Sequence, residues 1–458
     1  MSTNTPVLGS GKLRTHSLLR GKVKVEFSRV DDKLEHLNNV KNTVENRDVA
    51  IYVHIPYCRS VCMFCPYFRD VLRSEQELEK YFKALLRELE IYGKLLEEKN
   101  LNVVEVHVGG GTPSLVSSKL YKEFVDALTR FFSVKCKIGI EVNPEDFKDY
   151  RYVEELYSVG VDEVSIGVQS FDRRILKSLS RKHTPEDNVK AIENSIKAGF
   201  KWINVDIMFL TPSIKGCVEL TLDEKLKAFR EDLEKSYKLG VHQVTFYPTV
   251  IPKHTPGYKL AGYGRLSQEL NYIDAFIDEA VKFTQNNSLH LIRVYSASRK
   301  RYEYTTVNLE LVGPLIGLGA SAWSNTGTYQ YINTHSIQEY VGSIEKSTPP
   351  VIYSRSLKHT SRLWRLFFDQ LSAVEISEES FKLIGLKKMP FKVKLLLKVL
   401  ELSGIVTKSG RTYRLTRLGI REVYKSVMNY VIEVPVKTTG IFIEMSKFNN
   451  YPETIKIE

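Results

Sequence analysis

The chain has 458 residues, is 43% hydrophobic and carries a formal net charge of +12. This length exceeds one compact core and predicts a large domain with smaller attachments. No apolar run of about eighteen residues occurs, and the polar start lacks the apolar stretch of a signal peptide, so we expect a cytoplasmic protein without a membrane partner. Lys and Arg are interleaved with Glu, as in residues 75–100, which favours a solvated surface over a nucleic-acid site.

The first two thirds of the chain predict a parallel sheet. Residues 1–48 form a basic N-terminal extension in which KVKVEF is a possible strand. From residue 49 to 270, short apolar runs alternate with longer segments of helical period, which is typical of repeated βα units. The predicted strands are residues 49–55, 103–108, 138–142, 163–168, 202–210 and 243–250. Six such units indicate an α/β fold whose curved sheet is either open or three quarters of a barrel.

The last third predicts three further segments. Residues 271–357 have a helix-rich pattern, which we interpret as a helical extension closing the barrel. Residues 358–430 contain helices followed by two strands joined at Ser409-Gly410, an order that suggests a winged-helix-like module. Its apolar residues Leu363, Leu366, Phe367, Phe368 and Leu371 predict a face that docks on the rest of the chain. Residues 431–458 are expected to form a tail.

Three of the five cysteines lie directly after the first predicted strand. Cys58, Cys62 and Cys65 have the spacing C-x3-C-x2-C, which favours a metal centre over a disulfide framework. Three thiolates from one loop can hold an iron–sulfur cluster and leave one iron without a protein ligand. Zinc is the alternative, and it would need a fourth ligand, for which His54 is the nearest candidate. Cys136 and Cys217 stand alone and are expected to be inert.

Several ordered motifs carry a family resemblance. The segment YVHIPYCRSVCMFCPYF is followed by VGGGTPS, IEVNPE, SIGVQSFD, SRKHT, NVDIMF and GLGASAWS. From about residue 50 to 335 the chain thus resembles the radical S-adenosylmethionine (SAM) superfamily, in the branch of oxygen-independent coproporphyrinogen III oxidase, its heme-chaperone relatives and the class C radical SAM methyltransferases. The resemblance implies a partial (β/α)6 barrel, a 4Fe-4S cluster held by the three cysteines, and reductive cleavage of SAM. A reductase or ferredoxin-type protein would supply the electron.

The same motifs imply the residues that contact SAM. Gly110, Gly111 and Thr112 follow the second predicted strand, where glycines let the backbone approach a ligand closely. The resemblance implies that this loop binds the amino group of SAM. The resemblance also implies that six further residues contact SAM or line the pocket shared by SAM and the cluster. They are Tyr52, Phe64, Glu141, Gln169, Arg181 and Asp206.

The substrate is predicted from smaller differences. Coproporphyrinogen oxidases usually carry another cysteine where this chain has Tyr67, and heme chaperones usually carry a histidine where it has Trp323. The segment GLGASAWS looks closer to the oxidase, which favours a small-molecule tetrapyrrole substrate. The alternatives are a class C methyltransferase that uses two SAM molecules, a heme chaperone, and a winged-helix nucleic-acid protein with a zinc site.

Overall fold

A curved sheet of parallel strands forms the centre of the molecule. The computed structural model describes residues 25–44, 47–212, 217–261, 270–301, 313–448 and 451–457. All six predicted strands are present, as β2 (Asp48–Ile55), β5 (Asn102–Gly110), β7 (Ile138–Val142), β8 (Val161–Gln169), β9 (Trp202–Phe209) and β10 (Gln243–Pro248). They pair in parallel in this order, which confirms the predicted α/β fold.

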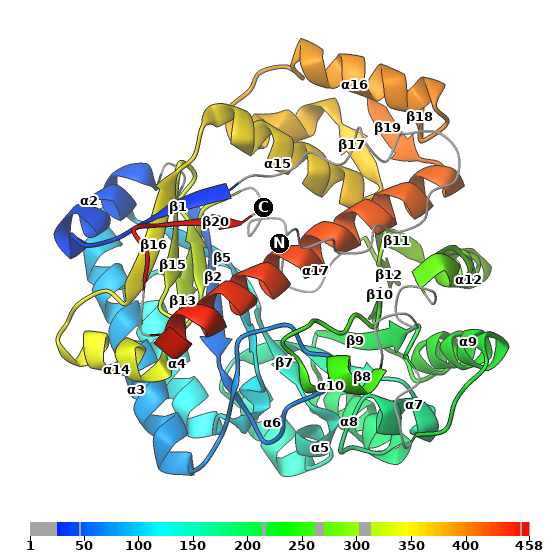
Figure 1. Cartoon of the computed structure of the whole chain (residues 1–458), viewed down its shortest axis with the longest axis horizontal. Coiled ribbons are helices and arrows are strands. Elements are labelled where there is room, and N and C mark those ends of the chain that lie inside the picture. Colours follow the sequence, from blue (N-terminus) through cyan, green and yellow to red (C-terminus); the bar gives the residue numbers. More distant parts are fainter. Residues whose placement is uncertain are drawn as a thin grey trace.

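Helices lie on the outer side of these strands (Figure 1). They are α3 (Glu75–Leu96), α4 (Ser118–Phe131), α5 (Pro144–Phe147), α6 (Tyr150–Ser158), α7 (Arg173–Ser178), α8 (Pro185–Ala198) and α9 (Leu222–Lys238). In α3 the apolar residues Leu78, Phe82, Leu85 and Leu89 recur on one face and are all buried. Each such side chain contributes about 1.5–3 kcal/mol by leaving water, which fixes the helix against the sheet.

Residues 271–357 differ from the prediction. In the described part of this range, residues 271–301 and 313–357, the α-helices are α12 (Ile273–Asn286) and α14 (Ile337–Glu345). The strands are β11 (His290–Arg293), β12 (Ser296–Ser298), β13 (Leu315–Leu318), β14 (Trp323–Asn325), β15 (Tyr329–Asn333) and β16 (Val351–Ser356). β13 pairs in parallel with β2, and β14 to β16 continue the sheet antiparallel. The predicted helical extension is therefore wrong, because strands this short show no clear period in a sequence.

The two ends of the described chain meet at one edge of the sheet. β1 (Val25–Arg29), which overlaps the predicted strand KVKVEF, lies between β16 and β20 (Thr454–Ile457). It pairs antiparallel with both, and Glu26 lies opposite Lys456. The predicted tail is therefore wrong: helix α17 (Arg417–Phe448) runs through the expected boundary at residue 430, and β20 then returns to the sheet. Ile455 and Ile457 cause this, since both are buried beside Phe27.

Residues 358–416 contain the predicted sequence of helices and a hairpin. The elements are α15 (His359–Ser372), β17 (Glu375–Ser377), the 3-10 helix η4 (Glu378–Ile384), α16 (Phe391–Leu402), β18 (Val406–Ser409) and β19 (Thr412–Leu415). β18 and β19 pair antiparallel, and β17 adds a third strand beside β19. Leu366, Phe367 and Leu371 are buried, and Leu363 and Phe368 pack against the main core, so the predicted docking face is confirmed.

Helix α17 joins the two sides of the sheet (Figure 1). Near its start, the Tyr424 hydroxyl donates to the carbonyl oxygen of Phe246 in β10 at 3.0 Å. Near its end, the Phe442 ring stacks on His335, which follows β15, with ring centroids 3.5 Å apart. The sheet is thus closed by a helix and not by further strand pairing. In the described ranges, no helix is both long enough and apolar enough to span a membrane.

Candidate cofactor-binding site

The three clustered cysteines lie on a loop that is pinned at its base. β3 (Tyr57–Cys58) pairs in parallel with β4 (Asp70–Val71), so the loop leaves and returns at neighbouring points. The Asp70 amide donates to the Pro56 carbonyl at 2.7 Å, and the Leu72 amide donates to the Cys58 carbonyl at 2.9 Å. The loop between these contacts carries Cys62 and Cys65. Its closed base holds all three thiols at one end of the barrel.

All three thiols line one cavity. The cavity holds about 100 Å³ and is lined by Cys58, Arg59, Ser60, Cys62, Phe64, Cys65, Arg69, Gly111, Thr112, Asn143, Glu145, Gln169, Ser180, Arg181 and Lys182. A second hollow of about 570 Å³, more open to solvent, shares Arg59, Ser60, Glu145 and Lys182 with it. Eight residues of the predicted site therefore meet at a single place, at the carboxyl ends of the parallel strands.

The surroundings of the thiols suit a positively charged centre. Burial raises the pKa of Cys58 to about 11, and the neighbouring Cys65 and Cys62 raise it further, against the Thr112 hydrogen bond and Arg69. Burial also raises the pKa of Cys65. Deprotonating such a group of buried thiols requires positive charge, which iron supplies. Arg181 contributes part of it, since its Nη1 lies 3.4 Å from the Cys62 sulfur.

The zinc alternative finds no fourth ligand in His54. Its Nδ1 lies 2.9 Å from the Tyr52 hydroxyl, and its Nε2 lies 3.0 Å from the Phe68 carbonyl oxygen, so both ring nitrogens are engaged. Among the described residues, no group of three or more His, Cys, Asp or Glu side chains is arranged to hold a metal ion. A four-iron cluster is wider than one ion, so its thiolates need not converge on a point. The engaged nitrogens of His54 leave zinc without the fourth ligand considered for it in the sequence.

The glycine loop after β5 fits closely against the cysteine loop. Gly110 has φ +110°, and a Cβ there would lie 2.8 Å from the His54 ring. At Gly111 a Cβ would lie 2.6 Å from the Tyr57 carbonyl oxygen. The Gly111 amide donates to the Ile55 carbonyl at 2.7 Å, and Thr112 is buried. Both positions thus require glycine, and the loop presents backbone groups beside Cys58.

The barrel interior adjoining this loop is polar. Glu141 accepts a hydrogen bond from the Gly110 amide at 3.3 Å, and its other carboxylate oxygen lies 3.2 Å from His107 Nε2. On β9, Asp206 accepts from Ser165 at 3.1 Å and from Asn204 at 3.0 Å. Burial, followed by the charge of Glu141, raises the pKa of Asp206 to about 7. Glu141 and Asp206 therefore face the same interior of the barrel.

Arg181 and Gln169 have buried polar atoms that the protein itself does not satisfy. Arg181 donates to Asn143 Oδ1 at 2.8 Å and to the Gly167 carbonyl at 3.2 Å, yet its Nε has no hydrogen-bond partner. Gln169 ends β8 with φ +63°, and its buried Oε1 also has no partner. An unsatisfied buried polar group costs about 1–3 kcal/mol, so two of them in one cavity point to a polar ligand there.

Phe64 and Tyr52 are the aromatic residues of the predicted site. Phe64 is one of the eight that line the cavity and packs against the apolar cluster that contains Met208 of β9, whereas Tyr52 contacts His54, whose ring lies against Gly110. Asn143 was missed, although it lies in the IEVNPE motif. Its side chain donates to Thr112 Oγ1 at 3.4 Å and accepts from Arg181, so it links two strand ends. Only the bonds between loops reveal this role, which single-sequence reasoning does not provide.

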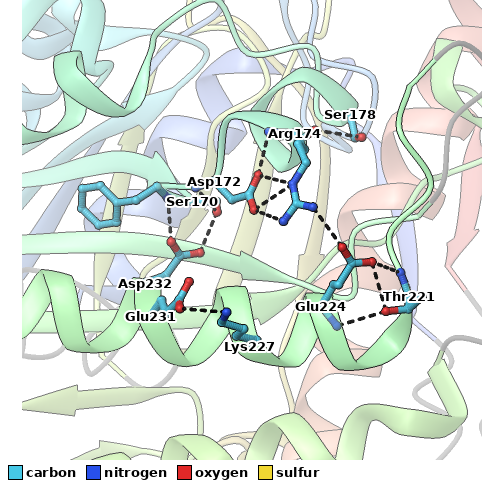
Figure 2. Close-up of polar contacts among 10 residues, drawn as sticks. Ser170, Asp172, Arg174, Ser178, Thr221, Glu224, Lys227, Glu231 and Asp232 are labelled. Carbon is cyan, nitrogen blue, oxygen red and sulfur yellow. Dashed lines mark hydrogen bonds and ion pairs between the residues drawn. The ribbon is translucent and has the colours of Figure 1, made fainter.

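The segment between Gln169 and Arg181 is clamped by helix α9 (Figure 2). Asp232 accepts hydrogen bonds from the Ser170 hydroxyl and the Phe171 amide, each at 2.6 Å. Arg174 binds Asp172, the N-cap of α7, and reaches Glu224 on α9 at 3.0 Å. These contacts fix the amino-terminal end of α7 and the turn that follows Gln169, one of the two residues that have unsatisfied atoms in the cavity.

The buried Asp232 carboxyl predicts a pH-dependent stability. Burial raises its pKa to about 7, whereas an exposed Asp titrates near 3.8. The folded state therefore holds this proton more tightly, so its stabilising contribution is full below the unfolded pKa and is lost as pH rises through about 7. We expect wild type to lose about 2–3 kcal/mol relative to Asp232→Asn between about pH 5 and 8, measured by urea unfolding at both values. Asparagine can still accept from the Phe171 amide through its oxygen and can donate from its amide nitrogen to the Ser170 hydroxyl oxygen, as the protonated carboxyl would. An equal pH slope in the two proteins would contradict this assignment.

Comparison with known proteins agrees with this geometry. The family model described as "Radical SAM superfamily" matches residues 52–224. The heme chaperone HemW of Buchnera aphidicola subsp. Schizaphis graminum is 29% identical over 279 residues, which cover 60% of this chain and 69% of that protein. Oxygen-independent coproporphyrinogen III oxidase of Pseudomonas aeruginosa is 26% identical over 342 residues, covering 70% of this chain and 71% of that protein.

A solved structure shares the fold. Coproporphyrinogen III oxidase (HemN) from Escherichia coli, which is described as a radical SAM enzyme, matches with a TM-score of 0.71 and 20% identity, over 88% of this chain and 95% of that one. A radical SAM domain uses a 4Fe-4S cluster and SAM, and the three thiols, the glycine loop and the unsatisfied polar atoms fit these two groups. Residues 52–224 are therefore a radical SAM domain, within a chain related to HemW and to the oxygen-independent coproporphyrinogen III oxidases.

Proposed function

We propose that this protein is a radical SAM enzyme that acts on a tetrapyrrole, in the manner of an oxygen-independent coproporphyrinogen III oxidase. The observation that carries the proposal is the cavity lined by the three cysteines together with Arg181 and Gln169, each of which has a buried polar atom without a partner. The tetrapyrrole part is supported by the names of the relatives, which are coproporphyrinogen oxidases and heme chaperones.

In this proposal each residue has a positional task. Cys58, Cys62 and Cys65 would hold the cluster, which together with SAM would supply one-electron reductive cleavage of the sulfonium, the chemistry that makes hydrogen abstraction possible. Arg181 offers its guanidinium to the carboxylate of SAM. The glycine loop, Glu141 and Asp206 would bind the amino group and the ribose of SAM. Tyr52 and Phe64 limit the space and exclude water.

One side chain favours the oxidase over the heme chaperone. The position where the chaperones usually carry a histidine is Trp323, on β14. Its indole ring meets Phe27 of β1 edge to face, with centroids 5.4 Å apart, and packs with the cluster of apolar residues at that edge of the sheet. A side chain engaged in this way supports packing and not the ligation of heme iron.

The proposal is tested by product analysis under anaerobic conditions. Reconstituted protein is incubated with reductant, SAM and coproporphyrinogen III, and both 5'-deoxyadenosine and tetrapyrrole products are measured by mass spectrometry. We expect the substrate to lose, at each reacting propionate, carbon dioxide and two hydrogen atoms, with 5'-deoxyadenosine formed in proportion.

The other outcomes identify the alternatives. A product heavier by one carbon, with two SAM molecules consumed, would replace the proposal with methyl transfer. Tight heme binding without any change in the tetrapyrrole would replace it with a chaperone. A third outcome is cleavage of SAM that coproporphyrinogen III does not stimulate and that leaves the tetrapyrrole unchanged, without heme binding. It would reject a tetrapyrrole substrate but keep the radical SAM chemistry.

A further inference from the structure

Helix α16 has apolar residues on two opposite faces. Val393, Leu397 and Leu400 are buried and fix the helix to its module. On the other side, Phe391, Leu395 and Leu402 have 78%, 57% and 78% of their surface exposed. With 3.6 residues per turn, these three positions fall within one narrow stripe. Phe391 and Leu402 are the most exposed of the large apolar side chains in the described parts of the chain.

Lysines surround this stripe. Residues 387–402 contain Lys387, Lys388, Lys392, Lys394 and Lys398, all exposed, and a single acidic residue, Glu401. Glu401 is paired with Lys398 at 2.9 Å, so four lysine charges are uncompensated within this segment. Figure 1 places α16 at the outer margin of the molecule, away from the cysteine loop. An apolar stripe bordered by lysines on a protruding helix is the pattern of a helix that lies in a membrane interface.

We propose that α16 binds the surface of an anionic lipid bilayer, with Phe391, Leu395 and Leu402 inserted between headgroups and the lysines on acidic phosphates. The expectation of no membrane partner rests on the lack of a spanning apolar run, and a helix lying flat on a bilayer needs none. This proposal does not depend on the substrate of the enzyme.

Charge disfavours two other occupants of the stripe. A second copy of this chain would bring the same lysines together across a symmetric contact, where like charges repel. Residues 1–24 contain lysine and arginine but no Asp or Glu, so they are also a poor electrostatic match. A bilayer of acidic lipid supplies both an apolar layer and negative charge.

Vesicle sedimentation of the full-length protein tests the proposal. We expect it to pellet with vesicles of phosphatidylcholine and phosphatidylglycerol, but not with phosphatidylcholine alone, and to be released by high salt. Replacing Phe391, Leu395 and Leu402 together by Gln is expected to lower the partition coefficient by about tenfold or more. Gln keeps the helix, and these exposed positions leave the core intact, which a thermal melt verifies.

Leu34→Gln is the matched control, because Leu34 is 69% exposed on another helix, α2 (Lys33–Thr43). This variant should pellet like wild type. The combination Lys387→Gln, Lys388→Gln and Lys394→Gln should weaken binding to acidic vesicles and leave SAM cleavage unchanged.

Three results would overturn the membrane proposal. The first is equal sedimentation of wild type and the triple apolar variant. The second is a dimer in solution that the apolar substitutions dissociate into monomers, which would assign the stripe to self-association. The third is a DNA complex that the lysine variants weaken and the apolar variants do not, which would assign the helix to nucleic acid. Each readout is independent of turnover, so failure here is distinguishable from failure of the proposed enzyme activity.

Discussion

Replacing Cys62 by Ser is expected to abolish both cluster assembly and SAM cleavage while the fold remains. The Cys62 thiol faces the cavity beside Arg181, and a hydroxyl is a poor substitute for a soft thiolate on iron. Two remaining thiolates cannot hold the cluster against loss to solvent. Because the Cys62 side chain is only half-buried, the free energy of unfolding of the iron-free protein should change by less than about 1 kcal/mol.

Iron content, the visible absorption of the reconstituted protein and the yield of 5'-deoxyadenosine measure this effect. Cys136→Ser is the control, since Cys136 precedes β7 at the opposite end of the strand from Glu141. The control should keep its iron and its turnover. Full turnover by Cys62→Ser would show that the three cysteines are not the ligand set.

Gly110→Ala is expected to have the second largest effect. An alanine there must adopt φ +110°, which costs about 1–2 kcal/mol, and its Cβ would meet the His54 ring at 2.8 Å. His54 cannot move freely, because both of its ring nitrogens are hydrogen-bonded. We expect the unfolding free energy to fall by about 2–4 kcal/mol and SAM binding by the reconstituted protein to be lost.

Gly160→Ala separates backbone strain from the contact with His54. Gly160 has φ +104°, but the nearest atom to a new Cβ lies 3.7 Å away, so only the strain applies. This variant should lose about 1–2 kcal/mol and bind SAM normally. Urea unfolding and calorimetric titration with SAM measure both quantities. Equal losses of stability in the two variants, with SAM binding retained in both, would rule out the tight fit around Gly110.

The parallel strands could be predicted from the sequence because they are buried on both faces of the sheet. A parallel strand covered on both faces is a continuous apolar run, and β7 (Ile138–Val142) occupies the predicted residues without any shift. The strands of residues 271–357 were not predictable, because β12 is only Ser296–Ser298 and β14 only Trp323–Asn325. Such segments become strands through pairing with a preformed sheet edge, which no local pattern records.

The site likewise contains residues that the sequence could indicate and contacts that it could not. Its cysteines and glycines could be proposed from the sequence because each chemical role restricts the residue type within one short segment. The clamp made by Asp232 was not found, since it joins a helix to a loop some sixty positions away, and an isolated aspartate in an amphipathic helix looks like a solvated charge. The bond between Asn143 and Arg181 likewise depends on two loops arriving together.

The pairing of β1 with β20 sets the order in which this sheet can be finished. Glu26 and Lys456 lie opposite each other, so β1 has only one strand neighbour until residues 454–457 have been synthesised. During translation the nascent chain therefore carries an unpaired strand edge, to which another chain can add. Contacts this distant in sequence also form slowly. Truncation before residue 454 should thus cause aggregation during expression and leave the chemistry at the far end of the barrel otherwise assembled.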